Sequence, residues 1–281
     1  MVKRKLVFPA VLLLGLGAIA GLKITLDAMT RVKQPGAGIV YLPAGPAVKA
    51  ATFGYSSFMA DIAYVWAIQY YGNSDIPDRL NNFNRIFTVI ADLDPKWVDP
   101  YLTAGLIAHY DFKDPELTLK MYDEGAVRNP KEWIFPFEAG HYCALPPLRD
   151  YERARAYYKI AMNIPGAPAI TKRLYADASF KTMDYKTSWE VWREVYETET
   201  NPEIKKIASN HLYQVKAAVD IAVLKVALSK FREQYGRAAR NLEELATARV
   251  IGSVPADFDG KDYVYDPQTG DIKTAVIPWK R

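Results

Sequence analysis

The sequence predicts an all-α fold: a solenoid of paired helices that follows one hydrophobic N-terminal helix and ends in a small α+β tail. Three observations support this prediction. A charge-free apolar run lies near the N-terminus, turn prolines recur at a nearly constant spacing, and short apolar segments flank a turn near the C-terminus. Half of the 281 residues are hydrophobic and 24% are charged, which suits a folded core and argues against disorder.

The N-terminal segment has the features of a membrane anchor. Residues 6–22 contain no charged side chain and follow Lys3, Arg4 and Lys5. As a helix, this run is about 25 Å long, which is near the lower limit for crossing a bilayer core. The basic tip predicts a cytoplasmic N-terminus and an exported body. We therefore expect a signal-anchor helix within residues 1–33, and its predicted membrane-contacting side chains are Leu6, Leu12, Leu13, Leu14, Leu16 and Ile19.

A cleavable signal peptide is the alternative interpretation of the same segment. Ala18-Ile19-Ala20 supplies a small-x-small cleavage pattern after an apolar core of suitable length. Both interpretations export the rest of the chain, and the uncleaved anchor is the one that we prefer.

The middle of the chain contains an internal repeat. Residues 34–46 hold three prolines and three glycines and are predicted to be a linker, and residues 47–71 are expected to form a long apolar helix. Between residues 47 and 202, predicted helix pairs end in similar turns. The turn prolines Pro95, Pro130, Pro165 and Pro202 lie 35, 35 and 37 residues apart. A period of about 34 residues is typical of a stacked helix-turn-helix repeat.

Small residues fall where paired helices must approach closely. Ala104-Gly105 and Ala139-Gly140 lie in the first helices of two units, and Ala154, Tyr158 and Ala161 lie in a second helix. With the proline spacing, these residues make the chain similar to the tetratricopeptide-repeat (TPR) family over about residues 55–202. The resemblance implies a right-handed solenoid. A helical bundle with coincidental spacing is the alternative.

The resemblance also implies a binding surface. Arrays of this family bind peptides or partner helices in a groove lined by first-helix residues. By repeat position, the groove residues are expected to be Leu102, Leu106, His109, Phe137 and His141.

A second resemblance concerns the location of the protein. Tyr41-Leu42-Pro43, Gly54-Tyr55, Ala60-Asp61 and Gln69-Tyr70-Tyr71-Gly72 resemble the opening segment of a group of bacterial membrane-anchored repeat proteins. This likeness implies a single-pass protein of the bacterial inner membrane with its body in the periplasm.

The C-terminal region is predicted to close the array and add a small module. Residues 203–235 have apolar positions at helical spacing and are expected to form a capping helix. Residues 236–281 are expected to form a short helix capped by Asn241, then a hairpin in which Val264-Tyr265 and Ile272 flank a turn. This tail partly resembles that of type II secretion pseudopilins.

The sequence contains no recognisable catalytic or metal-binding motif. Asp257, Asp259 and Asp262 lack the spacing of a calcium loop, so we expect a solvated acidic turn there. Cys143 is the single cysteine and is expected to be a small core residue. Phosphate loops, nucleophile elbows and zinc-helix motifs are absent from the sequence. We therefore expect no enzyme, no metal, no cofactor and no small-molecule substrate.

Charge gives no indication of nucleic-acid binding. The formal net charge is +4, but Lys3, Arg4 and Lys5 supply three of these charges, so the rest of the chain is nearly neutral. A nucleic-acid-binding body would need a clustered basic face. The expected function is a non-catalytic protein-interaction scaffold or assembly factor whose partners are other proteins. The alternative is a stoichiometric subunit of a large envelope complex of the secretion, pilus or respiratory type.

Overall fold

The computed structural model describes residues 2–28, 42–73, 76 and 79–277, and within the first helix it describes the side chains of residues 12–25 only. The fold is mostly helical: helices account for 69% of the described residues, and one two-stranded sheet occurs among them. The expected helical class with a small mixed tail is thus confirmed at this level.

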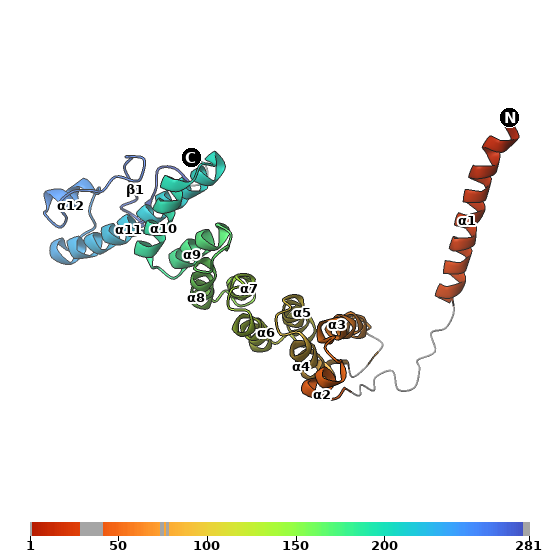
Figure 1. Ribbon diagram of the computed structural model, residues 1–281. Helices are drawn as coiled ribbons and strands as arrows, with labels where there is room; N and C mark the ends of the chain where they lie inside the picture. Colours follow the sequence, from red (N-terminus) through yellow and green to blue (C-terminus); the bar gives the residue numbers. More distant parts are fainter. Residues whose placement is uncertain (1, 29–41, 74–75, 77–78, 278–281) are drawn as a thin grey trace. The chain divides into compact units, whose positions relative to one another are not determined.

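The elements follow one another in a simple order (Figure 1). The helices before residue 95 are α1 (Val2–Ala28), α2 (Gly45–Ala51), α3 (Ser56–Gly72), the 3₁₀ turn η1 (Arg79–Asn82) and α4 (Phe83–Leu93). The helices after it are α5 (Asp99–Ile107), the π-turn η2 (Ala108–Phe112), α6 (Pro115–Arg128), α7 (Ile134–Ala144), α8 (Tyr151–Met162), α9 (Ile170–Lys181), α10 (Tyr185–Thr198), α11 (Pro202–Tyr235) and α12 (Glu243–Thr247). The strands are β1 (Val264–Tyr265) and β2 (Ile272–Lys273).

The chain divides into two compact units, residues 1–94 and 95–281. The division therefore falls inside the range 47–202 that the sequence predicts as one array. Most of the predicted linker, residues 34–41, lies outside the described residues, and Gly45 and Pro46 already belong to α2.

Helix α1 contains the predicted anchor segment. Among its described side chains, Leu12, Leu13, Leu14, Leu16 and Ile19 are all exposed, whereas the side chain of Leu6 lies outside the described residues. In the part of the chain that the structure describes, no helix combines the length and hydropathy needed to cross a membrane.

The rest of the first unit is a small helical cluster in which α4 packs against both α2 and α3. Its core is aromatic: the Tyr71 ring stacks on Phe87 at 5.7 Å, and Phe83 lies 5.1 Å from Phe87. Arg85 of α4 donates to the carbonyl oxygen of Leu42 at 2.7 Å, which attaches the segment before α2 to α4.

The predicted single helix over residues 47–71 is wrong, because the chain turns between α2 and α3. Phe53 has φ of 50° and Gly54 has φ of 95°. These left-handed conformations end α2, and the Tyr55 N–H donates to the Thr52 carbonyl at 3.0 Å to close the turn. Glycine is the residue that accepts such a conformation most easily, and Gly54 is the sequence signal for this break.

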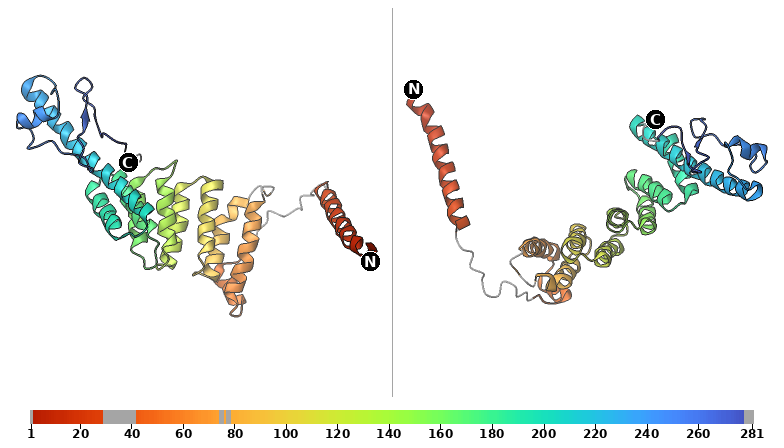
Figure 2. Two further views of the ribbon diagram at one scale, coloured as in Figure 1. Left: turned by 90° about the horizontal axis from the view of Figure 1, so that it is seen from above. Right: turned by 180° about the vertical axis from the view of Figure 1, so that it is seen from behind.

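The second unit consists of helix pairs that stack in chain order (Figure 2). Each helix from α5 to α11 contacts the next one along the chain. The second helix of each pair begins with an aspartate cap: Asp114, Asp150 and Asp184 each accept hydrogen bonds from backbone N–H groups in the first turn. This repeat-like architecture is compatible with the predicted TPR array.

Glycines allow the paired helices to approach. A Cβ atom at Gly105 would overlap the ring of Tyr122, and one at Gly140 would lie 2.8 Å from Cδ1 of Tyr158. Both tyrosines are buried. The same contact therefore joins the first and second helices of two successive pairs, as the small residues predict.

Helix α11 spans 34 residues and belongs to two hydrophobic clusters. Its N-terminal part packs through Leu212 against Trp192 of α10, and its C-terminal part packs through Leu224 and Phe231 against the tail. In the tail, Tyr265 pairs with Ile272 in an antiparallel ladder, which confirms the predicted hairpin.

Candidate protein-binding surface

The five predicted groove residues lie on first helices of the second unit. Leu102 and Leu106 belong to α5, His109 to η2, and Phe137 and His141 to α7. The side chains of Leu106 (50%) and His141 are exposed, and the other three are half-buried. We call these five residues the first-helix surface. Leu102 and Phe137 also pack against one buried cluster, so only part of each side chain faces solvent.

Aromatic contacts link the two helices that carry this surface. His109 Nδ1 lies 3.3 Å from the Tyr142 hydroxyl oxygen, within hydrogen-bonding distance, so the η2 turn is joined to α7. On α7, the Phe137 and His141 rings are nearly parallel with centroids 6.1 Å apart. Trp133 packs edge-on against Phe137. These contacts restrict the rotamers of the surface residues, which lowers the entropy lost on binding a partner.

The π-turn η2 determines how His109 is presented. The repeat pattern assumes regular helix at this position, but the structure widens to a π-turn from Ala108 and ends at Lys113 with φ of 54°. Single π-turns insert one residue into a helix and are frequent at functional positions. The turn leaves Tyr110 70% exposed beside His109, with ring centroids 4.5 Å apart. Tyr110 is a candidate contact residue that the repeat pattern does not indicate, because the pattern assumes regular helix.

The side chains around this surface have no arrangement suited to catalysis by a cysteine. Cys143 is buried, and burial raises the pKa of its thiol to about 11. The thiol is therefore protonated at neutral pH and a poor nucleophile. Within the described residues, no group of three His, Cys, Asp or Glu side chains lies close enough to hold a metal ion.

The acidic turn of the tail agrees with the prediction in part. Asp259 and Asp262 are exposed as predicted, but Asp257 is only 4% exposed. Its carboxylate accepts hydrogen bonds from the Tyr213 hydroxyl at 2.8 Å and from the N–H groups of Lys261 at 2.8 Å and Asp259 at 2.9 Å. Burial raises the pKa of Asp257, but these hydrogen bonds outweigh burial and lower it below the ordinary value. Asp257 therefore attaches the tail to α11.

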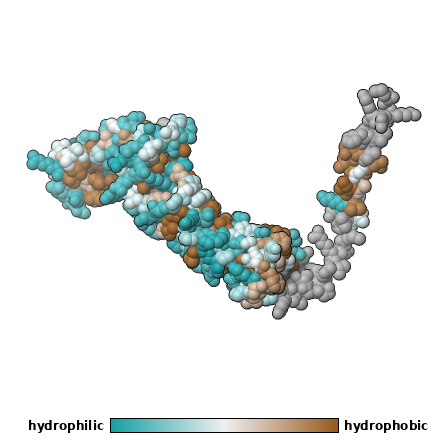
Figure 3. Space-filling view, viewed as in Figure 1, coloured by the Kyte–Doolittle hydropathy of each residue, from teal (hydrophilic) through white to brown (hydrophobic). Residues whose placement is uncertain are grey.

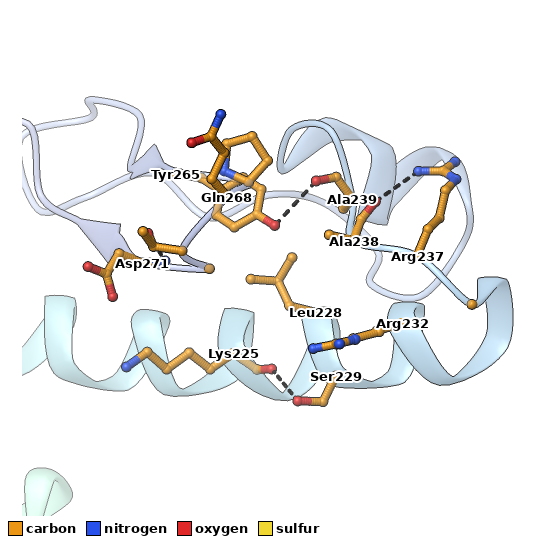
Figure 4. Close-up of a pocket in the computed structure, with 14 residues that line it drawn as sticks. Lys225, Leu228, Ser229, Arg232, Arg237, Ala238, Ala239, Tyr265, Gln268 and Asp271 are labelled. Atoms are coloured by element: carbon orange, nitrogen blue, oxygen red, sulfur yellow. Dashed lines mark hydrogen bonds between the residues drawn. The ribbon is translucent and has the colours of Figure 1, made fainter.

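A polar cavity of about 580 Å³ lies between α11 and the hairpin (Figure 4). Two of its lining side chains bond to neighbouring groups: Tyr265 donates to the Ala239 carbonyl at 3.2 Å, and Arg237 donates to the Ala238 carbonyl and to Glu244. The ion pair neutralises Arg237. The C-terminal end of α11 also borders the cavity, and its exposed carbonyl groups disfavour an anion. We interpret this cavity as a packing feature of the tail.

An apolar groove of about 640 Å³ lies between α10, α11 and the tail. Trp189 and Phe258 meet edge-on at 6.0 Å in its wall, and Val219 of α11 lines it. Val223 and Val226 continue the exposed apolar row along α11 at helical spacing.

Comparison with models of known protein families finds no match, and comparison with curated proteins also finds none.

Proposed function

We propose that the chain is a non-catalytic scaffold that binds other proteins through a right-handed TPR-like array. The observation that carries this proposal is the repetition of one helix pair in the second unit, each with an aspartate cap, and two of them with a glycine-to-tyrosine contact. Stacked pairs of this kind present successive first helices side by side. Leu106, His141 and the newly identified Tyr110 leave apolar and aromatic area exposed on those helices.

We also propose that α1 anchors this scaffold in a bacterial inner membrane. The support is the charge-free run of residues 6–22, preceded by three basic residues and followed by Lys23. The basic tip would remain cytoplasmic, and the part of the chain that follows α1 would lie in the periplasm. In this arrangement the partners are proteins of the envelope or of a membrane complex.

Site-specific photo-crosslinking in native membranes tests the first-helix surface. A photoreactive amino acid replaces Leu106 in one variant and Val127 in another. Val127 is the matched control because it is an 81% exposed apolar residue on the second helix α6. We expect discrete adducts from position 106 and none from position 127. Equal adduct patterns from both positions, or no adduct from position 106, would exclude the first-helix surface as the binding site.

A stoichiometric subunit of a large envelope complex is the second candidate. The apolar row of Val219, Val223 and Val226 favours it, because a permanent partner would keep such a row from water. Gentle extraction followed by mass spectrometry separates the two functions. A fixed set of partners in constant ratio indicates a subunit, and varied partners in small amounts indicate an adaptor.

A further inference from the structure

The first unit carries a concentrated apolar surface on α3 (Figure 3). Phe58, Ile62, Val65 and Trp66 are spaced by four, three and one residues, so they lie on one side of the helix. Their side chains are 39–60% exposed. We call these four residues the α3 patch. The opposite side of the helix, with Ala60 and Ala67, is buried.

The turn before α3 extends this patch. Phe53 is 91% exposed and is held at φ of 50°. A left-handed conformation costs a bulky residue about 1–2 kcal/mol, so the turn keeps an aromatic ring in water at the expense of backbone strain. Tyr55 is 73% exposed next to it. Both rings are exposed, so packing within the described part of the chain does not explain their positions. This points to a contact outside the chain.

The composition of the patch distinguishes among possible occupants. Asp61 is the only charged residue of α3, and helical spacing places it to one side of the patch. The patch and the preceding turn thus combine phenylalanine, tyrosine, tryptophan and branched aliphatic side chains without a charge. Tyrosine and tryptophan concentrate where hydrocarbon meets lipid headgroups, because one end of each ring system is apolar and the other is polar.

The position of the patch in the chain also favours a membrane. Thirteen residues, 29–41, separate the end of α1 from the first described residue of the helical cluster. Fully extended, they reach at most about 45 Å. An anchored α1 would therefore keep α3 within reach of the bilayer surface. The 17-residue helix is about 25 Å long, so it can lie along that surface.

We infer that the α3 patch inserts into the headgroup boundary of the same membrane that holds α1, with Phe53 and Tyr55 as additional aromatic contacts. This inference rests on the proposed anchor. Contact of α3 with the lipid would fix the height of the α2–α4 cluster above the membrane.

Spin-label depth measurements on the full chain test this inference. Single cysteines replace Leu14 in α1, Ile62 in the α3 patch and Val127 in α6, in vesicles of phosphatidylethanolamine and phosphatidylglycerol. Cys143 can remain, because it is buried and its thiol is protonated. Collisions with oxygen report contact with lipid, and collisions with a water-soluble nickel chelate report contact with water. We expect the oxygen-to-nickel ratio at position 62 to exceed that at position 127 several-fold.

The outcomes separate the inference from the anchor on which it rests. If label 14 is in lipid and label 62 is as accessible to the nickel chelate as label 127, the anchor is supported and the inference is wrong. If label 14 is in water, the anchor itself is refuted, and the inference fails with it. If label 62 is shielded from both reagents, a protein surface or a second copy covers the patch, and this also overturns the inference.

Discussion

At the scale of single residues, the spacing between helices depends on a glycine that faces a buried tyrosine. Gly140 faces Tyr158, and Gly105 faces Tyr122 in the preceding pair. The tyrosine rings cannot move away, since Tyr158 is 1% exposed and Tyr122 is 5% exposed. Any side chain larger than hydrogen at the glycine must therefore push the two helices apart.

Replacing Gly140 by alanine should destabilise the second unit. Alanine favours helix over glycine by about 1 kcal/mol, but the added methyl group would lie 2.8 Å from Tyr158 and 3.3 Å from the Ala154 carbonyl oxygen. Overpacking of this kind costs about 1–3 kcal/mol, so we expect a net loss of roughly 1 kcal/mol in urea unfolding. Gly252→Ala is the control, because a Cβ there meets no atom within 4 Å. If the Gly140→Ala variant is more stable than the wild type, the space between Gly140 and Tyr158 can accommodate a methyl group.

The carboxylate of Asp257 should make stability depend on pH. Its folded pKa is lowered, so its contribution is complete above the unfolded value of about 4 and is lost as the pH falls through the folded pKa. Asp257→Asn should cost about 1–3 kcal/mol near pH 7 and progressively less below pH 4. Thermal unfolding of both proteins between pH 3 and pH 7 measures the difference. Asp262→Asn, at an exposed position of the same loop, should show a small effect at every pH.

At the scale of elements, the sequence predicts the helix pairs well because their signals are local. The turn prolines act within a few residues of the positions that they specify, and the small residues face the next helix of the same pair. The hairpin was predictable for the same reason. Two errors come from contacts or conformations that periodicity does not encode. The break at Phe53 depends on a left-handed turn, and the burial of Asp257 depends on Tyr213, 44 residues away.

The candidate surface was predictable only in part. Repeat position identifies Leu106 and His141, which are exposed, but it also selects Leu102 and Phe137, which are half-buried in a shared cluster. It does not indicate Tyr110, because the π-turn shifts the register after Ala108. Pattern matching assumes uniform helix geometry, so a local widening moves the outward side by one residue.

At the scale of the whole molecule, the chain contains two compact units, residues 1–94 and 95–281. Each has its own hydrophobic core, with Ile86 and Ile90 central to the first and Tyr158 and Leu212 buried in the second. Because the cores are separate, the stability of each unit depends on its own buried apolar surface and its own conformational entropy.

The two units should therefore unfold in distinguishable transitions. Ile86→Ala removes buried methyl groups from the first unit and should cost about 2–5 kcal/mol there. Hydrogen exchange in increasing denaturant measures each unit separately. We expect protection to fall in α2, α3 and α4 and to stay unchanged in α7 and α8. A uniform loss of protection in both units would mean that they unfold as one.

The chain-order packing of α5 to α11 has a mechanical consequence. Since each helix from α5 to α11 contacts mainly its chain neighbours, a pull on the two ends of the α5–α11 array is resisted mainly by contacts between neighbouring helices. The array should lengthen in steps, releasing about one pair of helices at a time, and should recover when the load is removed. A scaffold of this kind can stretch while its partner moves and still remain attached at the helices that have not yet yielded.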